Sequence, residues 1–220
     1  MSTLTLAPNR SDCDQSKQIG ELLMSSKELQ AALEAAQAAA AVIQQLYRRN
    51  LAVTLKADKS PVTEADVRAE ETIQRILRTR FPDYGFYGEE GGRHAMHAES
   101  IWLVDPLDGT KSFVREAPFF STQIALMRAG ELILGVSCAS VYGEMAWAER
   151  GGGAFLDGQP IHTSGISELS AAFISTGNIS ALAASSGAVT ISRTSSCTLS
   201  TKYLTSSLSD PPRPGAAPAA

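Results

Sequence analysis

Cysteine is scarce in this sequence. The 220 residues include three cysteines, Cys13, Cys138 and Cys197, which lie far apart, lack Cys-x-x-Cys spacing and cannot all pair. A scaffold held together by disulfides is therefore not expected, and reduced thiols in a cytoplasmic protein are the default. Because Cys138 lies within an apolar run, we expect it to be a small buried side chain.

Long apolar runs and an excess of basic charge are also missing. No run approaches the roughly 18 residues that a bilayer crossing needs, and the first eighteen residues, interrupted by Pro8, lack the apolar segment of a signal peptide. The formal net charge is -4, so neither a membrane nor a nucleic acid is expected as a partner. A hydrophobic content of 44% with 19% charged residues is that of an ordinary globular protein.

Acidic residues, in contrast, are concentrated in one region. Of the 23 Asp and Glu residues, 12 lie between Asp58 and Glu116. Repulsion among so many carboxylates has to be relieved by solvent, by basic partners or by bound cations. Function should therefore be sought in this region.

The hydrophobic pattern predicts two helices followed by strands. The first helix is expected over about 20–50. The second is expected to start near Thr63, where Thr63-x-x-Asp66 has capping-box spacing, and to end before Pro82, with Val67 on its apolar stripe. Strands are expected at Ile101–Val104, Ser121–Met127, Leu132–Ser137 and Glu144–Ala148. This order indicates an α+β layered fold with mixed or antiparallel pairing.

Composition predicts three segments along the chain. A polar tail over 1–19 precedes a folded domain over 20–180, and a disordered tail is expected over 181–220. Residues 187–220 contain 12 Ser or Thr and four Pro but one carboxylate, Asp210. Limited proteolysis should therefore trim the C-terminal tail and leave a resistant fragment that ends near residue 180.

Three acidic clusters have the residue types of metal and phosphate chemistry: Asp66, the Glu89-Glu90 pair, and Asp105 through Thr110. Two carboxylates at the end of a strand suit magnesium, which prefers oxygen ligands, and backbone N–H groups at the start of a helix can bind a phosphate. Taken singly, the clusters have simpler explanations as a helix cap, a solvated loop and a turn. None of these explains all three together.

The same residues carry a specific resemblance. In order and spacing they resemble the inositol monophosphatase family of magnesium-dependent, lithium-sensitive phosphomonoesterases, whose fold is a layered helix-and-sheet sugar-phosphatase type. The similarity extends from about Ala31 to Gly177, and the Lys111-Ser112-Phe113 continuation is most similar to bacterial histidinol-phosphate phosphatases. Phosphatases that act on 3'-phosphoadenosine 5'-phosphate share the Ser60–Thr63 opening. The matching segments are Ser60–Asp66, Phe81-Pro82, Gly88-Glu89-Glu90 and Trp102–Thr110.

The resemblance implies a role for each residue of the clusters. Glu89, Asp105 and the Leu107 carbonyl would bind a first Mg²⁺. Asp105 and Asp108 would bind a second, and Glu89 is available to a third. Asp66 and Thr110 would polarise the attacking water, the Gly109 and Thr110 amides would hold the phosphate, and Glu90 would be an auxiliary ligand. The implied substrate is a small phosphorylated metabolite of the histidinol phosphate or inositol phosphate type, and the resemblance leaves homodimer formation open.

The sequence departs from the family's pattern towards its C-terminus. Members carry a further metal-binding aspartate, typically just after a tryptophan, whereas neither Trp102 nor Trp147 precedes an aspartate here. After Asp157 the only acids are Glu168 and Asp210. We therefore expect a C-terminally truncated member with only a fragment of the C-terminal part. Two functions stay open: a magnesium-dependent phosphomonoesterase, and a catalytically impaired remnant that binds metal weakly or associates with a homologue.

Two other features predict ordinary surface structure. The histidines His94, His97 and His162 have no matching set of Cys or His ligands, so we expect them in surface loops rather than in a zinc site. The run Gly151-Gly152-Gly153 is not followed by Lys-Ser/Thr and predicts a turn between strands.

Overall fold

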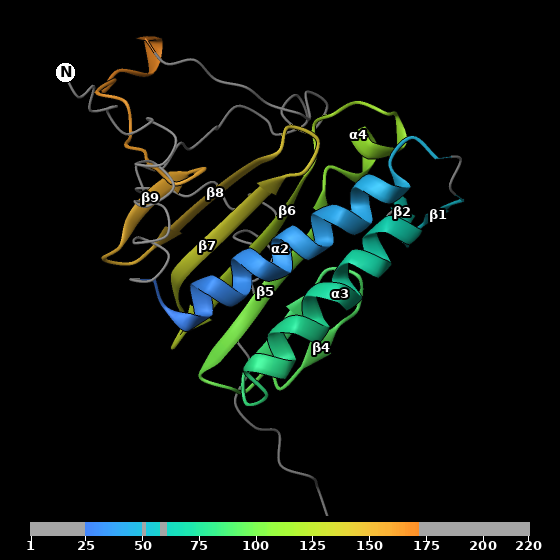
Figure 1. Cartoon of the computed structure of the whole chain (residues 1–220), viewed down its shortest axis with the longest axis horizontal. Helices are drawn as coiled ribbons and strands as arrows, with labels where there is room; N and C mark the ends of the chain where they lie inside the picture. The colour runs from blue at the N-terminus through green and yellow to red at the C-terminus, as the bar shows by residue number, and fades with distance from the viewer. Residues whose placement is uncertain (1–24, 50–51, 58–60, 172–220) are drawn as a thin grey trace, which may run out of the picture.

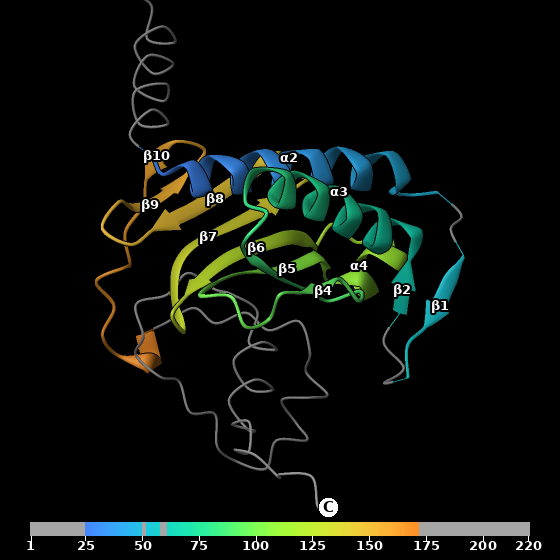
Figure 2. The same cartoon turned by 90° about the horizontal axis from the view of Figure 1, so that it is seen from below.

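The computed structural model describes residues 25–49, 52–57 and 61–171. Within this part, two long helices lie on the same side of a curved sheet, and a small two-stranded sheet lies at one end of the molecule (Figure 1 and Figure 2). Both predicted tails, Cys13, Cys197 and Asp210 lie outside the described residues. The α+β layered fold expected from the sequence is confirmed.

Helix α2 (Lys27–Leu46) is capped by Ser26, whose hydroxyl oxygen accepts the Leu29 N–H at 3.0 Å. Its inner face consists mostly of alanines, which combine high helix propensity with a small side chain. The small side chains let the helix approach its neighbours closely. The buried alanines are Ala31, Ala32, Ala35, Ala36, Ala39 and Ala40.

Helix α3 (Glu64–Arg80) begins with the capping box that the sequence predicts. The Thr63 hydroxyl oxygen accepts the Ala65 N–H, and the Asp66 carboxylate accepts the Thr63 N–H in return. The apolar stripe differs from the expected one, because Val67 is 41% exposed. The inward face instead contains two acids, Asp66 and Glu70, which are both buried.

The main sheet has eight strands among the described residues, in the order β10-β9-β8-β7-β6-β5-β3-β4. Only β3 and β5 pair in parallel, and the other neighbours are antiparallel, so the expected mixed pairing is confirmed. The strands are β3 (Gly85–Gly88), β4 (Arg93–His94), β5 (Ser100–Asp108), β6 (Ser121–Arg128), β7 (Glu131–Ala139), β8 (Glu144–Glu149), β9 (Gly153–Leu156) and β10 (Gln159–Pro160).

The remaining elements are short. Strands β1 (Val53–Leu55) and β2 (Pro61–Thr63) form the two-stranded sheet, α4 (Thr110–Val114) follows β5, and a 3-10 turn covers Leu169–Ala171. None of the helices in the described part of the chain combines the length and apolarity that a bilayer crossing requires.

Strand β5 is longer than the sequence predicts and contains an irregularity. It continues from Val104 through Pro106 to Asp108, and its register against β6 shifts between Asp105 and Asp108. Proline has no N–H to donate to the hydrogen bonds of a sheet, which is why it occurs at such irregular positions. The buried Thr122 hydroxyl donates to the Pro106 carbonyl oxygen at 2.9 Å and holds the distorted segment against β6.

Candidate active site

A hydrogen bond joins the first and third acidic clusters. The Thr110 hydroxyl, at the start of α4, lies 2.9 Å from Asp66 Oδ1 at the start of α3. The other carboxylate oxygen of Asp66 accepts the Thr63 N–H at 2.8 Å and the Thr63 hydroxyl at 2.6 Å. Burial raises the pKa of Asp66, and these hydrogen bonds act in the opposite direction. One carboxylate therefore caps its own helix and also contacts the site.

The second cluster lies beside the third because β3 and β5 are parallel. Gly88, at the end of β3, pairs with Val104, and the Glu89 N–H donates to the Val104 carbonyl oxygen at 3.1 Å. Asp105 is the next residue of β5. The carboxyl ends of parallel neighbours meet at one edge of a sheet, so Glu89 and Asp105 are brought together from positions far apart in the sequence.

Among the acidic residues at this edge of the sheet, Asp105 has the most strongly shifted pKa. Burial, the charge and hydrogen bond of Glu89, and the charge of Asp108 raise the pKa of Asp105 to about 9. A hydrogen bond between two carboxyl groups requires that the pair holds a proton, and the raised pKa of Asp105 agrees with such a protonated pair in the metal-free protein. Asp105 Oδ1 also accepts the Leu107 N–H at 3.2 Å, and this hydrogen bond restrains the backbone between Asp105 and Asp108.

Lys56 is a member of the site that the sequence did not reveal. It follows β1, and the β1–β2 hairpin brings its ammonium to 2.7 Å from Glu90 Oε1 and 3.4 Å from Glu89 Oε1. Burial raises the pKa of Glu90, whereas Lys56 acts to lower it. Lys56 thus supplies a positive charge beside these two carboxylates.

The donor set has the chemistry of a magnesium site. It consists of carboxylates and a backbone carbonyl oxygen. Burial, followed by the charges of Glu89 and Asp108, raises the pKa of Asp105, and a bound divalent cation would stabilise its ionised form. As the side chains stand, no three His, Cys, Asp or Glu residues within the described ranges are gathered closely enough to hold an ion. The ligand roles of Glu89, Asp105, Leu107 and Asp108 therefore stay predictions.

Gly109 is the turn between β5 and α4, and only glycine suits it. Its φ is +99°, and a Cβ there would lie 2.6 Å from the Phe119 carbonyl oxygen. We expect Gly109→Ala to lower the free energy of unfolding by about 2–4 kcal/mol, from backbone strain together with the clash. Urea denaturation should show this loss. Gly130→Ala is the matched control, since Gly130 has a φ of +82° but open space around it, and it should lose only about 1 kcal/mol.

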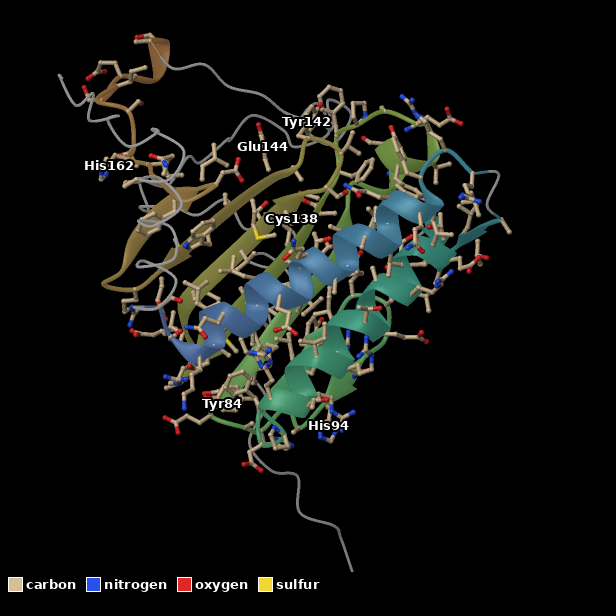
Figure 3. The ribbon with its side chains drawn as sticks, viewed as in Figure 1. Tyr84, His94, Cys138, Tyr142, Glu144 and His162 are labelled. Carbon is tan, nitrogen blue, oxygen red and sulfur yellow. The ribbon has the colours of Figure 1, made fainter. Side chains whose placement is uncertain are left out.

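The histidines do not contribute to this edge of the sheet. His94, His97 and His162 are exposed, and Figure 3 shows His94 and His162 at opposite ends of the molecule. All three are surface residues as expected, but His94 lies in strand β4 and not in a loop. Cys138 is buried on β7, as expected. Gly151 and Gly152 lie in the expected turn between β8 and β9, and Gly153 begins β9.

A model of the inositol monophosphatase family matches residues 24–199. The chain belongs to this family. A histidinol-phosphatase from Chlorobaculum parvum is 43% identical over 148 residues, which are 67% of this chain and 57% of the relative. An inositol-1-monophosphatase from Rhizobium meliloti is 41% identical over 59% of this chain and 49% of the relative. The chain thus spans about half the length of the curated family members that it matches.

Solved structures of the inositol monophosphatase family share the fold. The extragenic suppressor protein SuhB of Bartonella henselae has a TM-score of 0.62 and 33% identity, covering 64% of this chain and 56% of its own. The Thermotoga maritima IMPase has a TM-score of 0.60 with the same identity, covering 64% of this chain and 55% of its own. The family and fold expected from the sequence motifs are confirmed.

Proposed function

We propose that the chain is a magnesium-dependent phosphomonoesterase that hydrolyses a small phosphorylated metabolite of the histidinol phosphate or inositol phosphate type. The observation that carries the proposal is the Asp66–Thr110 hydrogen bond, because it links a buried carboxylate to the cluster of Glu89, Asp105 and Asp108. Membership of the inositol monophosphatase family and relatives named as histidinol-phosphatase and inositol-1-monophosphatase support it.

Each acidic residue has a distinct proposed task. Glu89, Asp105 and the Leu107 carbonyl would hold one Mg²⁺, and Asp105 with Asp108 would hold a second. Glu90, paired with Lys56, would be an auxiliary ligand. When bound, magnesium would lower the pKa of a coordinated water and neutralise the charge of the phosphate.

Asp66 and Thr110 would receive the proton of the attacking water. The Thr110 hydroxyl proton can go to Asp66 Oδ1 at 2.9 Å or to the Leu107 carbonyl oxygen at 3.1 Å, and the charged acceptor forms the stronger bond. When the Thr110 hydroxyl donates its hydrogen bond to Asp66, a lone pair of the Thr110 oxygen can face the attacking water. As the water loses its proton to Thr110 Oγ1, the hydroxyl proton of Thr110 moves to Asp66 Oδ1. The amides of Gly109 and Thr110 would hold the phosphate.

A phosphate-release assay tests the proposal. The full chain should release phosphate from histidinol phosphate or inositol phosphate in the presence of Mg²⁺, and EDTA should stop the release. 3'-Phosphoadenosine 5'-phosphate serves as the comparison substrate for the neighbouring branch of the family. Absence of release from all three esters at saturating Mg²⁺ would contradict the proposed activity.

The second function, a metal-binding protein with impaired catalysis, is favoured by one feature of the sequence. After Asp157 the chain contains only two acids, Glu168 and Asp210, and neither follows a tryptophan. Metal affinity in an oxygen-ligand site rises with the number and charge of the ligands. We therefore expect phosphate release to require millimolar Mg²⁺. A titration that shows full activity at sub-millimolar Mg²⁺ would rule out the impaired form.

A further inference from the structure

A second buried carboxylate on α3 contacts the loop that carries Glu89 and Glu90. Glu70 lies one helical turn after Asp66 and is only 6% exposed. Its Oε2 accepts the Glu90 N–H at 2.7 Å, and its Oε1 accepts the Gly92 N–H at 2.8 Å. A buried carboxylate has to be paired or hydrogen-bonded, and here both oxygens are satisfied by main-chain donors of one loop.

The loop is shaped around this carboxylate. A Cβ at Gly88 would lie 2.4 Å from the Glu70 carboxylate, and a Cβ at Gly92 would lie 2.8 Å from Glu70 Oε1. The Gly88 N–H donates to the Gly92 carbonyl oxygen at 2.7 Å and closes the loop. Two glycines therefore permit a close approach that any larger residue would prevent.

Glu89 is fixed on both sides by these contacts. Its own N–H is bound to the Val104 carbonyl oxygen of β5, and the N–H of the next residue is bound to Glu70. The peptide units before and after its Cα are thus anchored to different elements, which limits where the side chain can point. Asp105 follows Val104 directly, so the same anchors set the position of Glu89 relative to Asp105.

We propose that Glu70 is a positioning residue, which holds the 88–92 loop so that Glu89 and Glu90 can act as magnesium ligands. The proposal rests on the proposed function, because Glu89 and Glu90 are assigned as magnesium ligands there. Glu70 itself contacts the loop and is assigned no contact with substrate or metal. The proposal also gives α3 two tasks, since the helix places Asp66 against Thr110 and, one turn later, Glu70 against the loop. A displacement of α3 would then disturb proton acceptance and metal binding together.

Glu70→Gln tests this role with little change in size. The amide has one acceptor oxygen and directs N–H donors at the other main-chain N–H, so at least one of the two loop hydrogen bonds is lost. We expect the Glu90 or Gly92 amide to exchange with deuterium at least about tenfold faster. The Mg²⁺ concentration that half-saturates the rise in Tm, and that for phosphate release, should both increase about tenfold. Activity at saturating Mg²⁺ should change much less.

Glu71→Gln is the matched control, because Glu71 is the exposed neighbour on the same helix. It should leave amide exchange and the Mg²⁺ response unchanged. Should Glu70→Gln fail to fold, Gly92→Ala displaces the Glu70 carboxylate without changing any charge and should shift the Mg²⁺ response in the same direction.

Asp105→Asn separates failure of this inference from failure of the proposed function. If Asp105→Asn removes the Mg²⁺ response while Glu70→Gln lowers Tm but leaves the half-saturating Mg²⁺ unchanged, Glu70 has only a structural role and the inference is overturned. If Asp105→Asn also leaves the response unchanged, the magnesium site itself is wrong, and both proposals are overturned.

Discussion

Asp105→Asn is expected to stabilise the metal-free protein. The pKa of Asp105 is about 9 in the folded state and about 3.9 in the unfolded state. Between these two pH values the folded state therefore binds more protons than the unfolded state. The contribution of Asp105 to stability is thus complete near pH 4 and is lost as pH rises towards 9. Asparagine mimics the protonated form at every pH, so chemical denaturation in EDTA at pH 7 should show a gain of about 1–3 kcal/mol. The upper bound is about 4 kcal/mol, from the roughly three pKa units between pH 7 and the unfolded value.

The same substitution should remove the effects of magnesium. We expect phosphate release to fall by about two to three orders of magnitude, since a metal contributes several kcal/mol of transition-state stabilisation. Magnesium should no longer raise Tm. Asp83→Asn is the control, because Asp83 is exposed and lies outside the acidic clusters. A metal-free Asp105→Asn protein that is less stable than the parent chain at pH 7 would show that Asp105 is not held protonated by its neighbours.

Asp66→Asn should have the largest effect on the rate without abolishing magnesium binding. A positioned general base contributes about 10²–10⁴-fold, and the amide cannot accept the proton. Loss of part of the capping box should cost about 1 kcal/mol of stability in addition. In the parent chain the rate should rise with pH through the raised pKa of Asp66, because the ionised form accepts the proton. The measurement is the pH profile of phosphate release at saturating Mg²⁺.

Thr110 variants test whether Asp66 acts through the hydroxyl. Thr110→Ser keeps the hydroxyl and should keep most of the activity, whereas Thr110→Val should lose nearly as much as Asp66→Asn. Residues that act as one unit are not additive, so the double variant Asp66→Asn/Thr110→Val should be no slower than either single one. Full additivity of the two losses would contradict a shared proton path.

Local sequence signals predicted the parts of the molecule that depend on neighbouring residues. The capping box at Thr63 and Asp66 was predictable because both partners lie within one helical turn. Strand β5 was predicted too short, since Pro106 suggested an end, whereas the hydrogen bond from Thr122 on the next strand keeps the segment in the sheet. The three acidic clusters could be selected from residue type and spacing alone.

The contacts that depend on distant partners were not predictable in this way. Val67 fits the helical apolar pattern but is exposed, and Glu70 is buried because a loop some twenty residues later supplies two N–H donors. Lys56 reaches Glu90 only through the β1–β2 hairpin, and no local pattern marks it. In each case the deciding partner is brought in by tertiary structure.

The alanine face of α2 also has a consequence for the order of folding. This helix is the first described element, yet two of its polar contacts are with residues that come much later. Glu28 contacts Arg128, 100 positions away, and Gln44 contacts the Ser140 carbonyl, 96 positions away. Closing such long loops costs entropy before any contact is gained, and chains with many distant contacts fold slowly. On the ribosome, α2 therefore emerges well before the strands that cover its alanines. The hairpins β5–β6 and β6–β7 can form from neighbouring segments. We therefore expect α2 to dock onto the sheet after these hairpins have formed.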